Sequence, residues 1–190
     1  SGEINITNNG GGIDVEKHDE HKIYVPEMIF GNLLTSANYD MNEDKTTGGK
    51  NGYGAKLTNI YSSSFKIEIM DSTRNILYKQ DWSNNMSDKT EPVVKKQKRK
   101  ESWVSVSFIP DWSMFNMESL TDDMYKIMEK RAYDVCACTP KNVSVFLNGK
   151  KLEIKAFDKY VELYLGSNKT DNPRVHDYND RWEVVAAPSP

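Results

Sequence analysis

The feature that most constrains this chain is a glycine-rich run at residues 46–57 (TTGGKNGYGAKL), which contains four glycines and two lysines. Glycine lets a backbone turn through positive φ and lets a ligand approach without meeting a Cβ. An apolar helical pattern follows, and a helix that begins at such a loop presents free N–H groups to an anion. The run predicts a phosphate-binding loop with Lys50 and Lys56 as counter-charges. A plain flexible turn is the alternative, since glycine-rich loops are common.

The order of residues in this run excludes two common nucleotide-binding loops. A P-loop needs Ser or Thr directly after its lysine to hold magnesium, whereas Lys56 is followed by Leu57. The dinucleotide fingerprint is Gly-x-Gly-x-x-Gly, and Gly49, Gly52 and Gly54 follow the reverse spacing with no strand running directly into them. A phosphate site here is therefore of another type.

A second glycine cluster lies near the start, at residues 8–13 (NNGGGI), after an alternating, strand-like run. Asparagine tolerates tight turns, and its carboxamide can pair with a purine edge as both donor and acceptor. A base contact and a simple loop after an edge strand are both compatible with this pattern.

Composition predicts a globular domain. A chain of 190 residues fits one domain and can bury a sizeable core. No apolar run approaches the ~18 residues of a membrane span, so no membrane partner is expected. Cys136 and Cys138 are too few for a disulfide framework or a zinc site, which favours a reducing compartment and two core or near-core thiols. The charged stretch 18–21 (HDEH) lacks the spacing of a metal site.

One basic run, residues 95–100 (KKQKRK), stands out from a net charge of −3, which argues against the whole surface binding DNA. A nucleic-acid contact or a nuclear-import signal is one interpretation. The favoured interpretation is a solvated loop between two strands, because residues 83–92 before it are polar and read as disordered.

Alternation and helical periodicity predict the order of the elements. Strands are expected at residues 3–7, 64–71, 75–82, 102–109 and 142–147, and helices at residues 26–34, 54–61, about 120–136 and 157–165. Asn148-Gly149 is the strongest hairpin signal in the chain. Residues 166–180 are expected to form a loop.

Taken together, several motifs resemble a known family. Residues 8–13, 24–26 (YVP), 33–39 (LLTSANY) and 48–57 resemble, in the same order, the ATPase region of eukaryotic type II DNA topoisomerase. Residues 130–134 (KRAYD), 145–152 (VFLNGKKL) and 181–184 (RWEV) continue the likeness, which spans about residues 4–185. That region belongs to the GHKL ATPases, which include gyrase, MutL and histidine kinases.

The resemblance implies a role for each matching residue. Asn8 would contact the adenine, Gly12 would permit close approach of the nucleotide, and Ser107 would help to fix the adenine. Ribose and phosphate contacts would come from Ser36, Ala37 and Asn38, although Ala37 lacks the hydroxyl often found there. The lid around the triphosphate would comprise Gly49, Lys50, Asn51, Gly52, Tyr53, Gly54, Ala55 and Lys56. Lys50 replaces a common arginine and so loses the bidentate fork.

The implied fold is a two-layer α/β sandwich of the GHKL (Bergerat) type with a mixed, mostly antiparallel sheet. Residues 1–180 would form the ATPase domain without its N-terminal helix, and residues 181–190 would begin the transducer domain. The cofactors implied are ATP and Mg²⁺. In this family the general base, the magnesium ligand and the γ-phosphate sensor lie outside the range covered here. We therefore expect no catalytic or metal-ligating residue in this chain, and no ATP turnover by the chain alone.

The resemblance also implies partners: duplex DNA and a second copy of the subunit, both through the full-length protein. The nucleus is the expected location, with an organellar form as an alternative. Two other functions stay open on the sequence. One is a non-catalytic GHKL-like module that binds nucleotide or serves as an interaction domain. The other is a nucleic-acid-binding domain centred on residues 95–100, with structural glycines.

Overall fold

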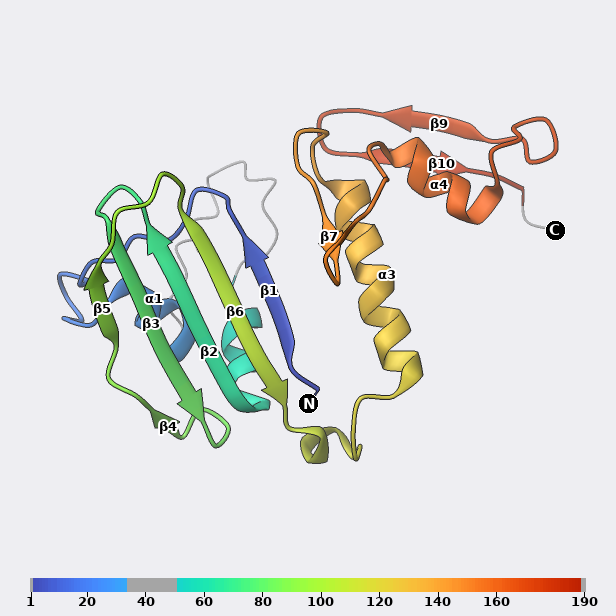
Figure 1. The fold of residues 1–190 in the computed structure, drawn as a ribbon. Helices are drawn as coiled ribbons and strands as arrows, with labels where there is room; N and C mark the ends of the chain where they lie inside the picture. The colour runs from blue at the N-terminus through green and yellow to red at the C-terminus, as the bar shows by residue number, and fades with distance from the viewer. Residues whose placement is uncertain (1, 34–50, 189–190) are drawn as a thin grey trace. The chain divides into compact units, whose positions relative to one another are not determined.

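The computed structural model describes residues 2–33 and 51–188 (Figure 1). The chain forms two compact units, Ser1–Ser119 and Leu120–Pro190. None of the helices within the described ranges has the length and apolar character that crossing a membrane requires.

The first unit is built on an antiparallel sheet of six strands, in the order β1-β6-β2-β3-β4, with β5 also pairing with β3. The strands are β1 (Ile4–Asn8), β2 (Ser62–Asp71), β3 (Ile76–Ser83), β4 (Asp88–Lys89), β5 (Val93–Lys96) and β6 (Trp103–Pro110). Two short helices, α1 (Val25–Gly31) and α2 (Gly54–Ile60), lie behind the sheet in Figure 1, and a 3-10 turn, η1 (Trp112–Phe115), follows β6.

The alternating sequence of β2 explains the core. Phe65, Ile67 and Ile69 are buried and, because successive strand residues point to opposite faces, all three project to the side that carries the helices. There they join Phe30 of α1 in one hydrophobic cluster, and Ala55 of α2 packs against it. The opposite face of the sheet is largely polar, so the helices define the buried side.

The second unit contains two helices and two small hairpins. Its elements are α3 (Asp122–Cys138), β7 (Phe146–Leu147), β8 (Lys150–Lys151), α4 (Phe157–Leu165), β9 (Val175–Tyr178) and β10 (Glu183–Ala186). Thr121 caps α3 by accepting a hydrogen bond from the Met124 backbone at 3.3 Å. Asn148 and Gly149 both have positive φ, as the predicted hairpin turn requires.

The α/β class and the antiparallel sheet are confirmed, but three local predictions were wrong. Residues 166–180 contain β9, which pairs with β10 although its sequence is polar. The strand expected at 142–147 is reduced to Phe146–Leu147, because the Val143 amide closes a turn onto the Pro140 carbonyl. The basic run begins in β5, an edge strand of the sheet, rather than lying wholly in a loop. Lysine on an edge strand discourages pairing with another chain.

Candidate functional site

The two glycine clusters open onto the same face of the sheet. Asn8 is the last residue of β1 and stands directly opposite Val104 of β6. Residues directly opposite across two strands project to the same face. Val104 is 6% exposed and belongs to the core cluster that also contains Phe30, against which Ala55 packs. Asn8 and the start of α2 therefore share the side of the sheet that carries the helices.

The first glycine loop (residues 8–12) leaves the Asn8 carboxamide available to a ligand. Asn8 is exposed, and its Oδ1 accepts a long hydrogen bond of 3.3 Å from the Gly10 amide. Among the described residues its amide nitrogen has no hydrogen-bond partner. Gly12 has φ +83°, and a Cβ there would lie 2.9 Å from the Cβ of Ser102. Glycine is thus required at position 12 by the protein's own packing, whatever else approaches it.

Ser107 lies on the opposite face of the sheet from Asn8. It is paired with Asn5, three positions along β1, and its Oγ accepts a hydrogen bond of 2.7 Å from Asn5 Nδ2. Because side chains alternate along a strand, Ser107 does not reach the face of Asn8. The residue that does is Val104, which carries no hydrogen-bonding group. The two-residue period of β6 is the sequence signal that could have separated these positions.

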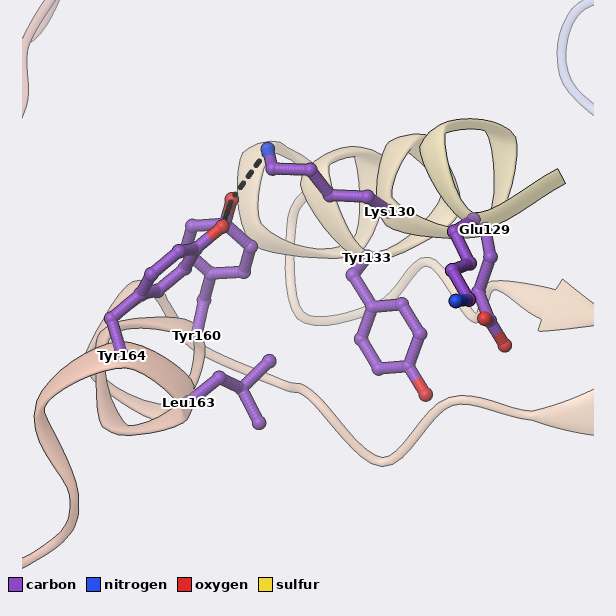
Figure 2. A pocket seen from close by; sticks show the side chains of 7 residues that line it. Glu129, Lys130, Tyr133, Tyr160, Leu163 and Tyr164 are labelled. Atoms are coloured by element: carbon purple, nitrogen blue, oxygen red, sulfur yellow. Dashed lines mark hydrogen bonds between the residues drawn. The ribbon is translucent and has the colours of Figure 1, made fainter. Parts of the chain in front are cut away.

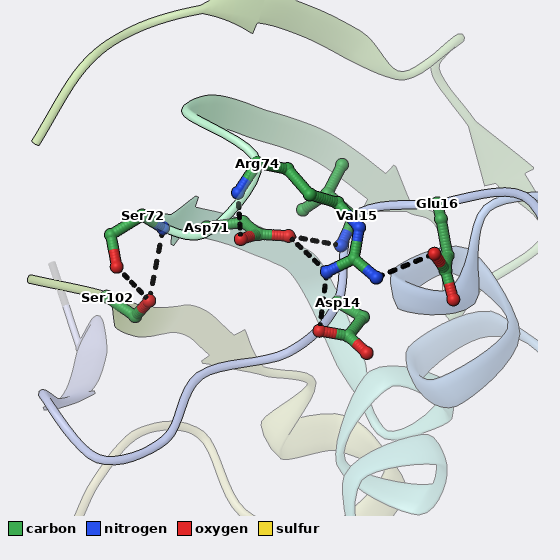
Figure 3. A network of polar contacts seen from close by, with 7 residues as sticks. All are labelled: Asp14, Val15, Glu16, Asp71, Ser72, Arg74 and Ser102. Carbon is green, nitrogen blue, oxygen red and sulfur yellow. Dashed lines mark hydrogen bonds and ion pairs between the residues drawn. The ribbon is translucent and has the colours of Figure 1, made fainter.

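An arginine holds the chain segment that follows the first glycine loop (Figure 3). The Arg74 guanidinium contacts Asp14 Oδ1 at 2.7 Å, Glu16 Oε2 at 2.7 Å and Asp71 Oδ2 at 3.1 Å. We call these four side chains the Arg74 clamp. The described residues contain no group of three or more metal-binding side chains arranged for an ion. Hydrogen bonds to Glu16 and then Asp14 raise the pKa of Arg74 above its already high value.

Asp71 is the buried member of the clamp. Its side chain is 3% exposed, and Oδ2 accepts a second hydrogen bond of 3.0 Å from the Val15 amide. Burial acts to raise the pKa of Asp71, but the Val15 and Arg74 hydrogen bonds outweigh it and hold this pKa below its usual range. Beside the clamp, Ser102 Oγ accepts from the Ser72 amide at 3.1 Å. Sequence reasoning missed this network, since Arg74 lies 60 positions from Asp14 and 58 from Glu16 in the chain.

At the second glycine cluster the described chain begins at Asn51. The expected site residues Ser36, Ala37, Asn38, Gly49 and Lys50 lie outside the described residues. Gly52 has φ +66° and leads through Tyr53 into α2 at Gly54. Tyr53, the N-cap, gives no side-chain cap to α2. The first amides of this helix therefore donate no hydrogen bond to their own N-cap side chain.

Two polar side chains are buried on α2. Lys56 is 1% exposed, and its Nζ donates to the Gly52 carbonyl at 3.1 Å. Burial lowers the pKa of Lys56. One turn later, Asn59 is also 1% exposed and donates to the Phe30 carbonyl at 3.1 Å, which ties α2 to α1. Within the described residues Asn59 Oδ1 has no hydrogen-bond partner. A short helix that served only packing would carry apolar residues here.

A hollow of about 390 Å³ lies in the second unit, between α3 and α4 (Figure 2). Three of its lining residues already have polar partners: Tyr160 donates to Asp134 and contacts Tyr164 at 2.9 Å, and Lys130 contacts Asp134 at 2.8 Å. The Asp134 carboxylate raises the pKa of Tyr160 to about 12. Among the described residues, none of those predicted to bind nucleotide lines this hollow. Cys136 on α3 is buried, as expected, but Cys138 is exposed, so the prediction of a second core or near-core thiol was wrong.

Comparison with known proteins gives no matching family model, but many related sequences and structures. The chain is 50% identical over 190 residues to DNA topoisomerase 2 of Arabidopsis thaliana, covering 97% of this chain and 13% of that protein. It is 46% identical over 201 residues to DNA topoisomerase 2 of Meyerozyma guilliermondii, covering 98% of this chain and 14% of that protein.

Solved structures agree with the sequences. The ATPase region of Saccharomyces cerevisiae topoisomerase II superposes with a TM-score of 0.92 at 43% identity, covering 100% of this chain and 50% of that one. The ATPase and transducer domains of Balamuthia mandrillaris DNA topoisomerase II give a TM-score of 0.89 at 43% identity, covering 99% of this chain and 48% of that one. The chain thus spans about half of these solved chains and a much smaller part of the full-length relatives.

Proposed function

This chain is a homologue of the ATPase region of type II DNA topoisomerases, and on that premise we propose that it binds ATP between the first glycine loop and the start of α2. Its fold is that of the GHKL ATPases. Asn8 would read the adenine edge, while the amides of residues 51–54 and the Lys56 ammonium would take the phosphates.

The observation that carries this proposal is the burial of Lys56. An ammonium with a single described acceptor, the Gly52 carbonyl, is costly in a protein interior. Perturbed, buried titratable groups collect at functional sites, because a ligand of opposite charge offsets their cost. Lys56 lies two residues after Gly54, the last glycine of the run, so a triphosphate held by that run would lie within its reach.

The residues present fit the adenine and phosphate parts of ATP better than they fit Mg²⁺. Asn8 offers a free donor, and Lys56 offers a cation. The described residues include no group of acidic, histidine and cysteine side chains arranged for an ion. We therefore assign Mg²⁺ to the phosphates of the bound nucleotide, without a ligand among these residues.

In the full-length protein this site would serve a type II DNA topoisomerase. We infer that ATP binding and hydrolysis there drive the passage of one duplex through another, in a homodimer in the nucleus. Residues 1–180 would form the ATPase domain, and residues 181–190 would begin the transducer. Strand β10 spans part of the latter range and pairs with β9. The homology to DNA topoisomerase 2 proteins supports the activity proposed for the full-length protein.

Binding of a non-hydrolysable ATP analogue tests the nucleotide site. We expect the wild-type chain to bind, and Asn8→Ala and Lys56→Ala each to bind more weakly. Lys79→Ala is the matched control, because it removes an exposed lysine that pairs with Glu68 on the other face of the sheet. A wild-type chain that does not bind, or substitutions that leave affinity unchanged, would contradict the proposal.

A further inference from the structure

The middle of the first glycine loop makes few packing contacts and few hydrogen bonds. Residues 10–12 are three consecutive glycines, which lose more conformational freedom on ordering than any other residue. No atom lies within 4 Å of the position that a Cβ on Gly11 would occupy. The Gly10 amide is held by Asn8 Oδ1, at the long distance of 3.3 Å. The order of this loop therefore depends on what fixes its two ends.

The near end is fixed by the sheet, because Asn8 stands opposite Val104 in the β1–β6 ladder. The far end is fixed by side chains. Gly12 abuts Ser102, and the residues after it are bound by the Arg74 clamp (Figure 3). Asp71 holds the Val15 backbone from one side, while Arg74 pairs with Asp14 and Glu16 on either side of Val15. The clamp thus joins residues 14–16 to the turn between β2 and β3.

The geometry of the clamp depends on a guanidinium. One nitrogen, Nη1, contacts both Asp14 and Asp71, and the other, Nη2, contacts Glu16. A planar fork with several donors can hold three carboxylates at once, whereas the single ammonium of lysine cannot match these directions. Lysine at position 74 would keep the charge and lose part of the connection.

We propose that Arg74 is a positioning residue for base selection: by holding residues 14–16, it fixes the far end of the first glycine loop and, through Gly10, the orientation of the Asn8 carboxamide. This inference rests on the proposed nucleotide site. A carboxamide that is free to turn over exchanges its donor and its acceptor, and could then pair with either purine edge. The bond from the Gly10 amide to Asn8 Oδ1 prevents that exchange only while Gly10 is held in place. Loss of the clamp should therefore weaken discrimination between bases rather than phosphate binding.

The test compares non-hydrolysable ATP and GTP analogues on the 190-residue chain and on its Arg74→Lys variant. We expect the wild type to prefer the ATP analogue. In Arg74→Lys the affinity for the ATP analogue should fall about tenfold, while the affinity for the GTP analogue stays unchanged. Lys79→Met is the control, since it breaks an exposed ion pair with Glu68 on the same sheet and should keep the wild-type preference.

Amide hydrogen exchange of the free proteins gives a second readout that needs no nucleotide. In Arg74→Lys the amides of residues 10–15 should exchange faster, while those of β2 keep their protection. An equal fall for both analogues, an unchanged preference, or an unchanged exchange rate at residues 10–15 would each overturn the role of Arg74. A wild-type chain that binds neither analogue would instead overturn the proposed nucleotide site, and this inference with it.

Discussion

The two ends of the candidate site satisfy their polar groups in opposite ways. At the first glycine loop, Asn8 is exposed, and the residues that follow the loop belong to the Arg74 clamp. There Arg74 pairs with Asp14 and Asp71, and Asp71 also accepts a hydrogen bond from the Val15 amide. At α2, Lys56 and Asn59 are buried with one described acceptor for the first and an unpartnered oxygen on the second. The first end is held by interactions within the chain, whereas the second end has polar groups that find few or no partners among residues 2–33 and 51–188.

This difference indicates that the Arg74 end positions the backbone, while the α2 end binds the ligand. A fully hydrogen-bonded network stabilises one backbone arrangement, and its polar groups need no ligand to complete their hydrogen bonds. A buried, poorly partnered cation costs stability, and proteins retain such groups where they serve function. We therefore expect substitutions at α2 to increase stability and lower the affinity for nucleotide. Substitutions around Arg74 should reduce stability or base selectivity.

The largest effect is expected for Lys56→Met. The loss of a charged phosphate contact should weaken binding of the ATP analogue about 10- to 100-fold. The same change removes a buried ammonium whose pKa is lowered by burial, so the folded state should gain about 1 kcal/mol. Calorimetric titration and thermal unfolding measure the two effects, with Lys79→Met as the control. A variant that binds normally, or that is less stable than wild type, would remove the contrast between the two ends.

The clamp predicts a pH dependence of stability. The pKa of Asp71 is lowered in the folded state, so its contribution is fully present above the unfolded pKa of about 4 and is lost as pH falls through the folded pKa. Asp71→Asn should lose about 2 kcal/mol at neutral pH and show a shallower decline below about pH 4. Urea unfolding across pH 2 to 7 (roughly the range that titrates carboxylates) checks this. If the free energy of unfolding fell equally steeply at low pH in both proteins, Asp71 would not be the source of the pH dependence.

A smaller and more selective effect is expected for Asn8→Ala. Removing one exposed carboxamide should weaken the ATP analogue about tenfold and leave the GTP analogue and the thermal midpoint nearly unchanged. Titrations with both analogues measure this directly. If both affinities fell equally, Asn8 would be acting on the loop as a whole and not on the base.

The smallest effect is expected for Ser107→Ala. Its hydroxyl pairs with Asn5 on the face of the sheet away from the helices, so affinity for the ATP analogue should change by less than about twofold. The same titration decides. A clear loss of affinity would place the base on the polar face and reverse our account of the site.

The elements predicted with most success were those with a strong local pattern. The alternation of β2 and the Asn-Gly turn at 148–149 specify a strand and a hairpin without reference to the rest of the chain. The polar strand β9 was missed because its support comes from other elements: it pairs with β10, and His176 contacts Asp158 and Phe157 of α4. Local sequence carries no such information about distant partners.

The site shows the same limit. The two glycine clusters were recognisable because glycine and asparagine have distinctive backbone behaviour. That Asn8 shares the face of Val104 and not that of Ser107 depended on the register between β1 and β6, and the link of Arg74 to Asp14 and Glu16 depended on the whole sheet. Both are tertiary facts. The resemblance to the family selected Ser107, and nothing local marked Arg74.

The most direct test of the account is an NMR titration of the isotope-labelled chain with adenosine, with tripolyphosphate and with the ATP analogue. We predict that adenosine shifts the amides of residues 10–12, that tripolyphosphate shifts those of residues 52–56, and that the analogue shifts both sets. A single nucleotide site shared by the two glycine clusters would be contradicted if the analogue shifted only one cluster. It would also be contradicted if the analogue instead shifted the residues that line the hollow between α3 and α4.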